Sequence, residues 1–399
     1  MSVWPTARIE SFCATGTGGT PSRGSMERYY KGGTIPWVKS GELREGIIND
    51  TEEHVTEAAL QETNVKLVPS GALLLAMYGA TVGRLGLLGV PATTNQAVCH
   101  IIPDPKAADV RYLFRALSNQ VSGIVARGVG GAQPNISQGI VKALTVPLPP
   151  LPEQRRIAEV LDRAEALRAK RRAALAQLDT LTQSIFLDLF GDPGDNPKAW
   201  PMREVSDYVA EFQGGKSLEA ESGENVAARN RILKISAVTS TEFEPDESKP
   251  VPDSYTPPSE HFVRTGDLLF SRANTTELVG AVAYVGRTPP NLLLPDKLWR
   301  FVWRDSAAVE PLFVRTLFHT PAVRREIARR ATGTSGSMKN ISQEKLFGIR
   351  TILPPLSVQT EFVRRSNAVD KLKSAHRASL AKLDALFASL QHRAFRGEL

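Results

Sequence analysis

Two long stretches of the chain repeat apolar residues with the period of a coiled coil. In the first, apolar side chains recur at Ile157, Val160, Leu161, Ala164, Leu167, Ala174, Leu175, Leu178, Leu181, Ile185 and Leu189. In the second they recur at Phe362, Val369, Leu372, Leu380, Leu383, Leu386 and Leu390. A mean spacing of about 3.5 residues is typical of helices that pair along an apolar seam. Each stretch therefore predicts an amphipathic helix of about 34 residues, or four to five heptads.

A basic residue stands midway along each predicted seam, Arg171 in the first helix and His376 in the second. Two interpretations stay open. The long side chain could extend its polar end out of the seam into water. Alternatively, the two residues could form a polar layer that sets the register where the helices cross.

Short runs of Val, Ile, Leu and Phe, broken by Gly and Pro, precede each long helix and predict β-strands. These runs are Ala72–Met77, Leu85–Val90, Ile232–Val238, Asp267–Ser271, Gly280–Val285 and Trp299–Trp303. Helical patterns follow at Val110–Val125 and Pro311–Arg330. The chain is thus expected to belong to the α+β class.

The chain repeats itself. Residues Asn135–Phe190 align without a gap on Asn340–Phe395, and 19 of the 56 positions are identical. Asn-Ile-Ser-Gln and Leu-Pro-Pro-Leu occur in both copies, each Leu-Pro-Pro-Leu followed by a glutamine, Gln154 or Gln359. Upstream, Gly18-Gly19 matches Gly214-Gly215 more weakly. This is a duplication, and its pseudo-twofold symmetry favours antiparallel pairing of the two helices.

The duplication defines the expected domain organisation. We expect α/β domains over residues 1–150 and 192–355, and coiled-coil helices over residues 151–191 and 356–399. The segment 191–197, with the sequence Gly-Asp-Pro-Gly-Asp-Asn-Pro, is a strong turn and linker signal between the two copies.

Composition changes this picture little. Hydrophobic residues make up 42% of the 399 residues, the formal net charge is +7, and there are only two cysteines. The charge permits nucleic-acid binding without requiring it. Too few cysteines are present for a disulfide framework, and the six histidines show no metal spacing. With no apolar leader or membrane stretch, a cytoplasmic location is expected.

Enzyme motifs fail on inspection. Gly215-Lys216-Ser217 resembles the end of a P-loop, but Ala210 stands where the earlier glycine is required. The run Asp246–Lys249 has nuclease-like spacing but lies in a proline-rich stretch, where a solvated charge run is the better interpretation. We therefore expect no catalytic residue, no metal and no cofactor.

The motifs of the chain follow one order. An early Gly-Gly-Thr-Pro (Gly18–Pro21) is followed by Asn-Ile-Ser, by Leu-Pro-Pro-Leu-Pro-Glu-Gln-Arg-Arg-Ile (Leu148–Ile157) and by a long helix, and the arrangement is then repeated. It resembles the specificity (S) subunit of type I restriction–modification systems. The second copy departs mildly, with Ser357-Val358 in place of Pro-Glu. The resemblance implies two target recognition domains that each read one half of a bipartite DNA site. It also implies a coiled coil that sets the gap between the half-sites.

The resemblance further implies partners. Methyltransferase (M) subunits, two in number, would methylate adenine N6, and restriction (R) subunits would join for cleavage. The S subunit itself would supply no catalytic residue.

Candidate DNA contacts are polar or basic residues at strand ends and glycine-containing turns, where side chains can reach base edges or phosphates. In the first copy these are Lys39, Ser40, Tyr78, Thr81, Arg84, Asn95 and Gln96. In the second copy they are Lys234, Arg272, Asn274, Lys297, Arg300 and Lys339. A purely structural role in turns stays open for each. The glycine-rich loops at 128–135 and 333–340 could likewise bring amides to phosphate or serve as plain turns.

Two other classes of function stay open at this stage. One is a two-headed scaffold that assembles proteins, which a preference for bipartite DNA would exclude. The other is a self-sufficient nuclease or methyltransferase, which activity of the purified chain alone would indicate.

Overall fold

The computed structural model describes residues 4–126, 135–217, 229–240, 242–335 and 338–399. The chain divides into two compact units: unit 1 ends at Ala173 and resumes at Arg377, and unit 2 covers Ala174–His376. Each unit contains one half of each long helix. This division cuts both long helices and does not test the expected domain bounds near residues 150, 191 and 355, which stay a prediction.

Unit 1 is built on a five-stranded sheet in the order β2 (Cys13–Thr17), β9 (Val98–Pro103), β6 (Leu73–Ala76), β7 (Leu85–Leu88), β4 (Ile47–Ile48). Only the β4–β7 pair is parallel. A second sheet has the order β5 (His54–Val55), β3 (Ile35–Val38), β8 (Thr93–Thr94), and β1 (Thr6–Arg8) pairs with β10 (Thr145–Pro147). The helices are α1 (Met26–Tyr29), α2 (Glu57–Glu62), α3 (Val110–Ser118), α4 (Val121–Ala126) and α5 (Gln138–Ala143).

Unit 2 repeats this plan around an antiparallel sheet, β12 (Val209–Gly214), β19 (Leu298–Trp303), β15 (Leu268–Ser271), β17 (Val282–Tyr284). Two three-stranded sheets accompany it: β14 (Ser248–Pro250), β13 (Arg231–Leu233), β18 (Leu292–Leu293), and β16 (Ala273–Asn274), β21 (Met338–Asn340), β20 (Thr332–Ser335). β11 (Met202–Glu204) pairs with β22 (Arg350–Ile352). The helices are α7 (Val205–Tyr208), α8 (Pro311–His319), α9 (Pro321–Arg330) and α10 (Gln343–Phe347).

Three predicted elements differ in detail. The strand expected over Ile232–Val238 ends at Leu233, and the chain then turns into a 3-10 helix, Ile235–Val238. Each helix expected late in a domain is broken in two, the second one at Thr320-Pro321. Proline explains that break, because it lacks the N–H that would continue the first helix and suits the start of the next.

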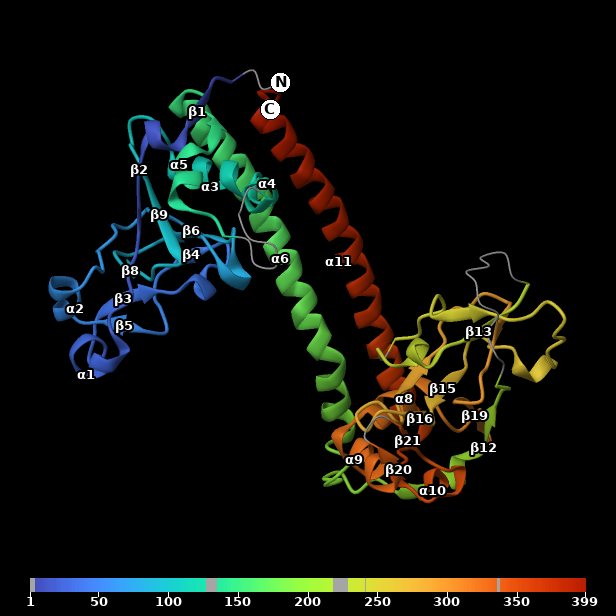
Figure 1. The fold of residues 1–399 in the computed structure, drawn as a ribbon. Helices are drawn as coiled ribbons and strands as arrows, with labels where there is room; N and C mark the ends of the chain where they lie inside the picture. The colour runs from blue at the N-terminus through green and yellow to red at the C-terminus, as the bar shows by residue number, and fades with distance from the viewer. Residues whose placement is uncertain (1–3, 127–134, 218–228, 241, 336–337) are drawn as a thin grey trace. The chain divides into compact units, whose positions relative to one another are not determined.

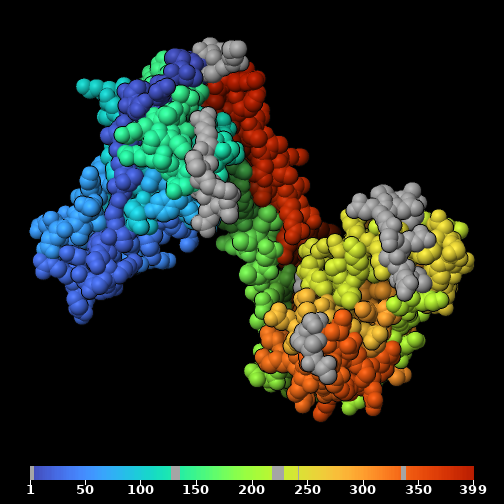
Figure 2. All heavy atoms as spheres, viewed as in Figure 1, coloured from blue at the N-terminus to red at the C-terminus, as the bar shows by residue number. Residues whose placement is uncertain are grey.

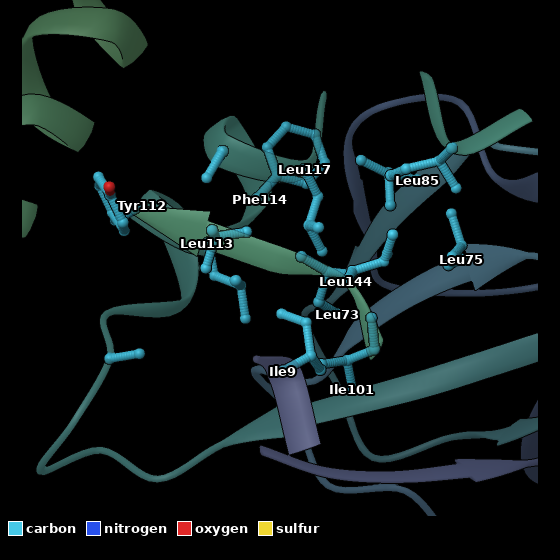
Figure 3. Close-up of a cluster of buried hydrophobic side chains, with 14 of the residues drawn as sticks. Ile9, Leu73, Leu75, Leu85, Ile101, Tyr112, Leu113, Phe114, Leu117 and Leu144 are labelled. Atoms are coloured by element: carbon cyan, nitrogen blue, oxygen red, sulfur yellow. The ribbon is translucent and has the colours of Figure 1, made fainter. Parts of the chain in front are cut away.

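The core of unit 1 joins the sheet to both long helices. Ile9, Leu73, Ile101 and Tyr112 lie among its buried side chains (Figure 3). Phe387 and Phe395 from the end of the second long helix complete the cluster. In unit 2, the corresponding core takes Phe186 and Phe190 from the first long helix and Phe362 from the second. Each globular part is therefore closed by the two helices together.

The long helices are α6 (Leu151–Phe190) and α11 (Leu356–Arg396), of 40 and 41 residues (Figure 1). They exceed the expected length because each begins at the last leucine of Leu-Pro-Pro-Leu. The repeated glutamine stabilises the start of each helix through its side-chain hydrogen bonds. Fully buried Gln154 accepts a hydrogen bond from the Asp109 amide (2.8 Å) and donates to the Pro149 carbonyl (2.8 Å). Gln359 repeats both contacts with Glu310 (3.0 Å) and Pro354 (2.8 Å).

Within each unit the two helices pack antiparallel, as expected. Arg168 bonds to Asp384 at 2.6 Å in unit 1, and Lys373 bonds to Asp179 at 3.0 Å in unit 2. The half-buried or buried positions recur at heptad spacing and define the seam. In α6 they are Ala164, Arg168, Arg171, Leu175, Leu178, Thr182, Ile185 and Leu189, and in α11 Val369, Lys373, His376, Leu380, Leu383, Phe387, Leu390 and Ala394.

The seam corrects part of the sequence prediction. Arg171 and His376 are seam residues, as predicted. Leu167, Leu181, Leu372 and Leu386 are not: their exposed fractions are 53, 39, 51 and 50%. Each of these leucines lies one residue before a seam position. The seam positions themselves are occupied by Arg168, Thr182, Lys373 and Phe387. Among the described helices, none is both long and apolar enough to cross a membrane.

Candidate nucleic-acid interface

A loop at the same strand end occurs in both units. In unit 1, residues 77–83 follow β6, and the Gly83 amide closes the loop by donating to the Ala76 carbonyl at 2.8 Å. In unit 2, residues 272–280 follow β15, and Gly280 donates to Ser271 at 2.7 Å. Both glycines have a positive φ, +83° and +80°, which favours glycine at the loop end. We call these segments the strand-end loops.

The repeated Asn-Ile-Ser anchors each strand-end loop. The Ile136 amide donates to the Met77 carbonyl at 2.7 Å, and the Ile341 amide donates to the Arg272 carbonyl at 3.0 Å. The serine after each isoleucine then caps a short helix: Ser137 accepts from the Ile140 amide, and Ser342 from the Lys345 amide. The motif thus fixes the loop on one side and starts α5 or α10 on the other.

In unit 2 the structure brings four predicted site residues together on neighbouring segments. The Arg272 amide donates to the Lys297 carbonyl at 3.1 Å, and Asn274 pairs with Lys339 between β16 and β21. The Arg272 side chain donates to the Asp296 carbonyl at 2.8 Å and lies 5.5 Å from the Trp299 ring. Lys339 Nζ donates to the Gly333 carbonyl at 2.8 Å. The Asn274 Oδ1 accepts from the Thr275 amide at 2.8 Å.

In unit 1, Tyr78 and Thr81 lie on the strand-end loop, and the exposed Arg84 follows it directly. Burial raises the pKa of Tyr78 above its ordinary value. Asn95 accepts from the Ala97 amide at 3.2 Å, and Gln96 accepts from the Thr20 hydroxyl. Thr20 belongs to the early Gly-Gly-Thr-Pro and was not among the predicted site residues.

Lys39 and Lys234 occupy equivalent places but have acidic neighbours. Each directly follows a strand, β3 or β13, and begins a 3-10 helix; Ser40 is the first residue of the one after Lys39. Lys39 Nζ lies 3.1 Å from Glu52 and 3.0 Å from Glu53, and these hydrogen bonds raise the pKa of Lys39. Lys234 lies 3.8 Å from Glu247. Both lysines are already paired with carboxylates, so they are weaker phosphate candidates than Arg84 or Lys297.

Arg300 is placed differently from the other predicted contacts. It is buried at 7% exposure on the central strand β19, and its Nε lies 2.9 Å from Asp267. Its remaining nitrogens donate to Gln213 at 3.1 Å and to backbone carbonyls. This burial argues against the expectation that Arg300 contacts DNA. A lone arginine in an almost wholly apolar strand signals a buried ion pair, since an unpaired charge there would be very costly.

Two further expectations concern the first glycine-rich loop and metal binding. The first glycine-rich loop, at 128–135, lies outside the described residues except for Asn135. Among the described residues, no group of three or more His, Cys, Asp or Glu side chains is arranged to hold a metal ion.

Comparison with known proteins gives a consistent result. A family model described as "Type I restriction modification DNA specificity domain" matches residues 1–177. The EcoKI specificity subunit of Escherichia coli K12 is 24% identical over 99% of this chain and 89% of its own length. The MjaVIII specificity subunit of Methanocaldococcus jannaschii is 22% identical over 92% of this chain and 86% of its own length.

Solved structures share the fold. The S subunit of a type I restriction–modification system from M. genitalium superposes with a TM-score of 0.60 at 14% identity, covering 98% of this chain and 96% of that one. A chain from a structure of type I R-M complex assembly and conformational transition gives a TM-score of 0.59 at 17% identity, covering 99% and 98%. With its duplicated strand-end loops and paired long helices, the chain belongs to the type I restriction–modification specificity subunits, which are non-catalytic DNA-recognition subunits.

Proposed function

We propose that this chain reads a bipartite DNA site, one half with each unit, and directs an adenine-N6 methyltransferase and an endonuclease to it. The observation that carries the proposal is the pair of strand-end loops, each anchored by its own Asn-Ile-Ser. Two equivalent loops on divergent domains suit two different half-sites. The side chains on and beside them differ in kind, since Arg272 stands where unit 1 has Met77.

In unit 2 the proposed contacts are Arg272, Asn274, Lys297 and Lys339. Arginine can pair with guanine and asparagine with adenine, whereas the lysines suit phosphate. In unit 1 they are Tyr78, Thr81, Arg84, Asn95 and Gln96. Lys39, Ser40 and Lys234 stand at the neighbouring strand ends and complete the proposed surface, from which buried Arg300 is omitted.

Selection of bound duplexes from a random-sequence pool tests the proposal. The chain would be purified with the methyltransferase subunit of its own system. We expect two specified segments separated by an unspecified gap of fixed length. Changing Asn274→Ala should relax one segment only, and Thr81→Ala the other only. A single contiguous motif, or none, would overturn the bipartite interpretation.

We also propose that the methyltransferase subunits dock on the exposed leucines of the long helices. Leu167 and Leu386 stand at matching heptad positions in unit 1, as do Leu181 and Leu372 in unit 2; we call each pair a leucine flank. Asp188 and Arg365 occupy this same heptad position further along unit 2. The Arg365 guanidinium lies 3.7 Å from the Asp188 carboxylate across the helix pair. Such positions of two antiparallel helices therefore lie on one side of the seam.

The other side of the helix pair differs in chemistry. There Arg168 and Arg172 reach Asp384, and Lys373 reaches Asp179. Exposed apolar positions beside a seam are typical of sites where a further amphipathic helix packs. Both long helices keep a surface-exposed face (Figure 2). One leucine flank in each unit suits two copies of the same partner, with the endonuclease subunits joining the resulting complex.

A further inference from the structure

In unit 2 an arginine from a neighbouring helix holds the strand-end loop by its backbone. Arg324 lies on α9, and its Nη1 donates to the Val279 carbonyl at 2.7 Å. Its Nη2 donates to the Glu277 carbonyl at 2.6 Å. One planar guanidinium thus binds two carbonyls of the same loop, which fixes the orientation of the loop as well as its position.

The loop closes tightly against this helix. A Cβ at Gly280 would lie 2.6 Å from Ile327 and 2.9 Å from Arg324, so only glycine allows so close an approach. Inside the loop, the Val279 amide donates to Thr275 at 2.9 Å, directly after Asn274. Thr276, Glu277 and Leu278 are exposed at the tip. Arg324 therefore holds the tip and the residue after it, and the Val279–Thr275 hydrogen bond connects that side of the loop to the residue after Asn274.

In unit 1 the loop glycine packs against a different pair of side chains. A Cβ at Gly83 would meet Val125 at 2.7 Å and Val121 at 3.0 Å, both from α4. Neither valine can donate a side-chain hydrogen bond to the loop, whereas Arg324 donates two in unit 2. The loop is also shorter there, with residues 77–83 in place of 272–280. A shorter loop needs less support, since it has fewer conformations to restrict.

We propose that Arg324 is a positioning residue that holds the strand-end loop of unit 2 in the conformation that reads its half-site. This inference rests on the proposed function. Arg324 itself touches backbone carbonyls and not DNA. Its contribution is to the placement of Arg272, Asn274 and the loop tip, so its loss weakens base discrimination in one half-site rather than overall affinity.

The test compares Arg324→Met with Arg325→Met in the complex with the methyltransferase subunit. Both changes remove one positive charge from α9, but Arg325 is exposed, and among the described residues it is Arg324 and not Arg325 that forms hydrogen bonds with the loop. Binding is measured on duplexes with single base changes in each half-site. Arg324→Met should lower discrimination in the unit 2 half-site by about tenfold, and leave the unit 1 half-site unchanged. Arg324→Lys, which keeps one donor, should restore part of it.

Hydrogen exchange gives a second readout that does not depend on DNA. Residues 275–280 should exchange faster in Arg324→Met than in Arg325→Met, with residues 77–83 unchanged in both. Should Arg324→Met fail to fold, Arg324→Gln replaces it. Unchanged discrimination in the unit 2 half-site, or an equal loss in both half-sites, would overturn the inference. The absence of any bipartite preference in the unmodified chain would instead refute the proposed function.

Discussion

Gln154 and Gln359 illustrate how a repeated polar residue acquires its role. Both are fully buried, and each ties the start of a long helix to the residue that precedes α3 or α8. The sequence shows that the glutamine recurs after Leu-Pro-Pro-Leu, but its partners are about 45 residues away along the chain and cannot be predicted from spacing. Buried amides are costly unless bonded, which is why the contacts recur in both copies.

His319, at the end of α8, should make the free energy of unfolding depend on pH in the acid range. Burial, with Arg315 and Arg324 nearby, lowers the pKa of His319 to about 4. Between pH 6.5 and 4 the unfolded chain binds a proton that the folded chain does not, so the free energy of unfolding falls as the pH decreases. Linkage gives a loss of about 2 kcal/mol between pH 7.5 and 5.

Urea denaturation of the full chain at both pH values measures this loss. The His319→Gln variant should lose about 2 kcal/mol less over the same interval, while the exposed control His392→Gln should behave as the unmodified chain. Equal losses in all three proteins would show that His319 is not responsible.

At the scale of elements, the period of the apolar pattern was sufficient to predict both long helices but not their seam. A leucine one residue before a seam position fits a 3.5-residue spacing almost as well as one in the seam. Basic residues at Arg168 and Lys373 then made the neighbouring Leu167 and Leu372 look like the better seam residues. In the structure the basic side chains extend to Asp384 and Asp179, so their stems fill the seam while their charges leave it.

Two leucine substitutions in α6 distinguish seam from flank. Leu175→Ala should lower the free energy of unfolding by about 1–2 kcal/mol, because Leu175 is half-buried in the seam. Leu181→Ala should change it by less than about 0.5 kcal/mol, because that side chain is exposed.

Binding of the methyltransferase subunit should show the opposite order. The Leu181→Ala/Leu372→Ala variant should weaken it, whereas Leu175→Ala should affect it less, and the exposed polar control Gln177→Ala should not affect it. Unchanged binding in the double variant would contradict docking on the leucine flank.

At the scale of the whole molecule, the duplication was visible in sequence, whereas the way the two copies share helices was not. Each core needs residues from both α6 and α11, with Phe395 in unit 1 and Phe190 in unit 2. The Trp4 indole donates to Ala394 at 3.3 Å, and Trp200 donates to Phe190 at 3.1 Å. The Trp4 contact joins opposite ends of the chain, and no local sequence pattern predicts it.

Shortening both helices by one heptad tests whether they set the DNA gap. Removing residues 172–178 and 373–379 deletes facing segments, so the seam keeps its register. At 1.5 Å per residue each helix loses about 10 Å, which corresponds to about three base pairs of B-DNA. The selected site should keep both half-sites and have a shorter gap. Altered half-sites with an unchanged gap would contradict this role for the helices.

The most direct test of the central claim is a map of N6-methyladenine in the organism that carries this chain, with its gene intact and deleted. We expect a bipartite motif with a fixed gap to be methylated in the first strain and unmethylated in the second. Restoring the gene with the Asn274→Ala change should then alter one half of the motif. A methylation map that is identical with and without the gene, while the methyltransferase subunit is expressed, would show that the chain does not direct methylation.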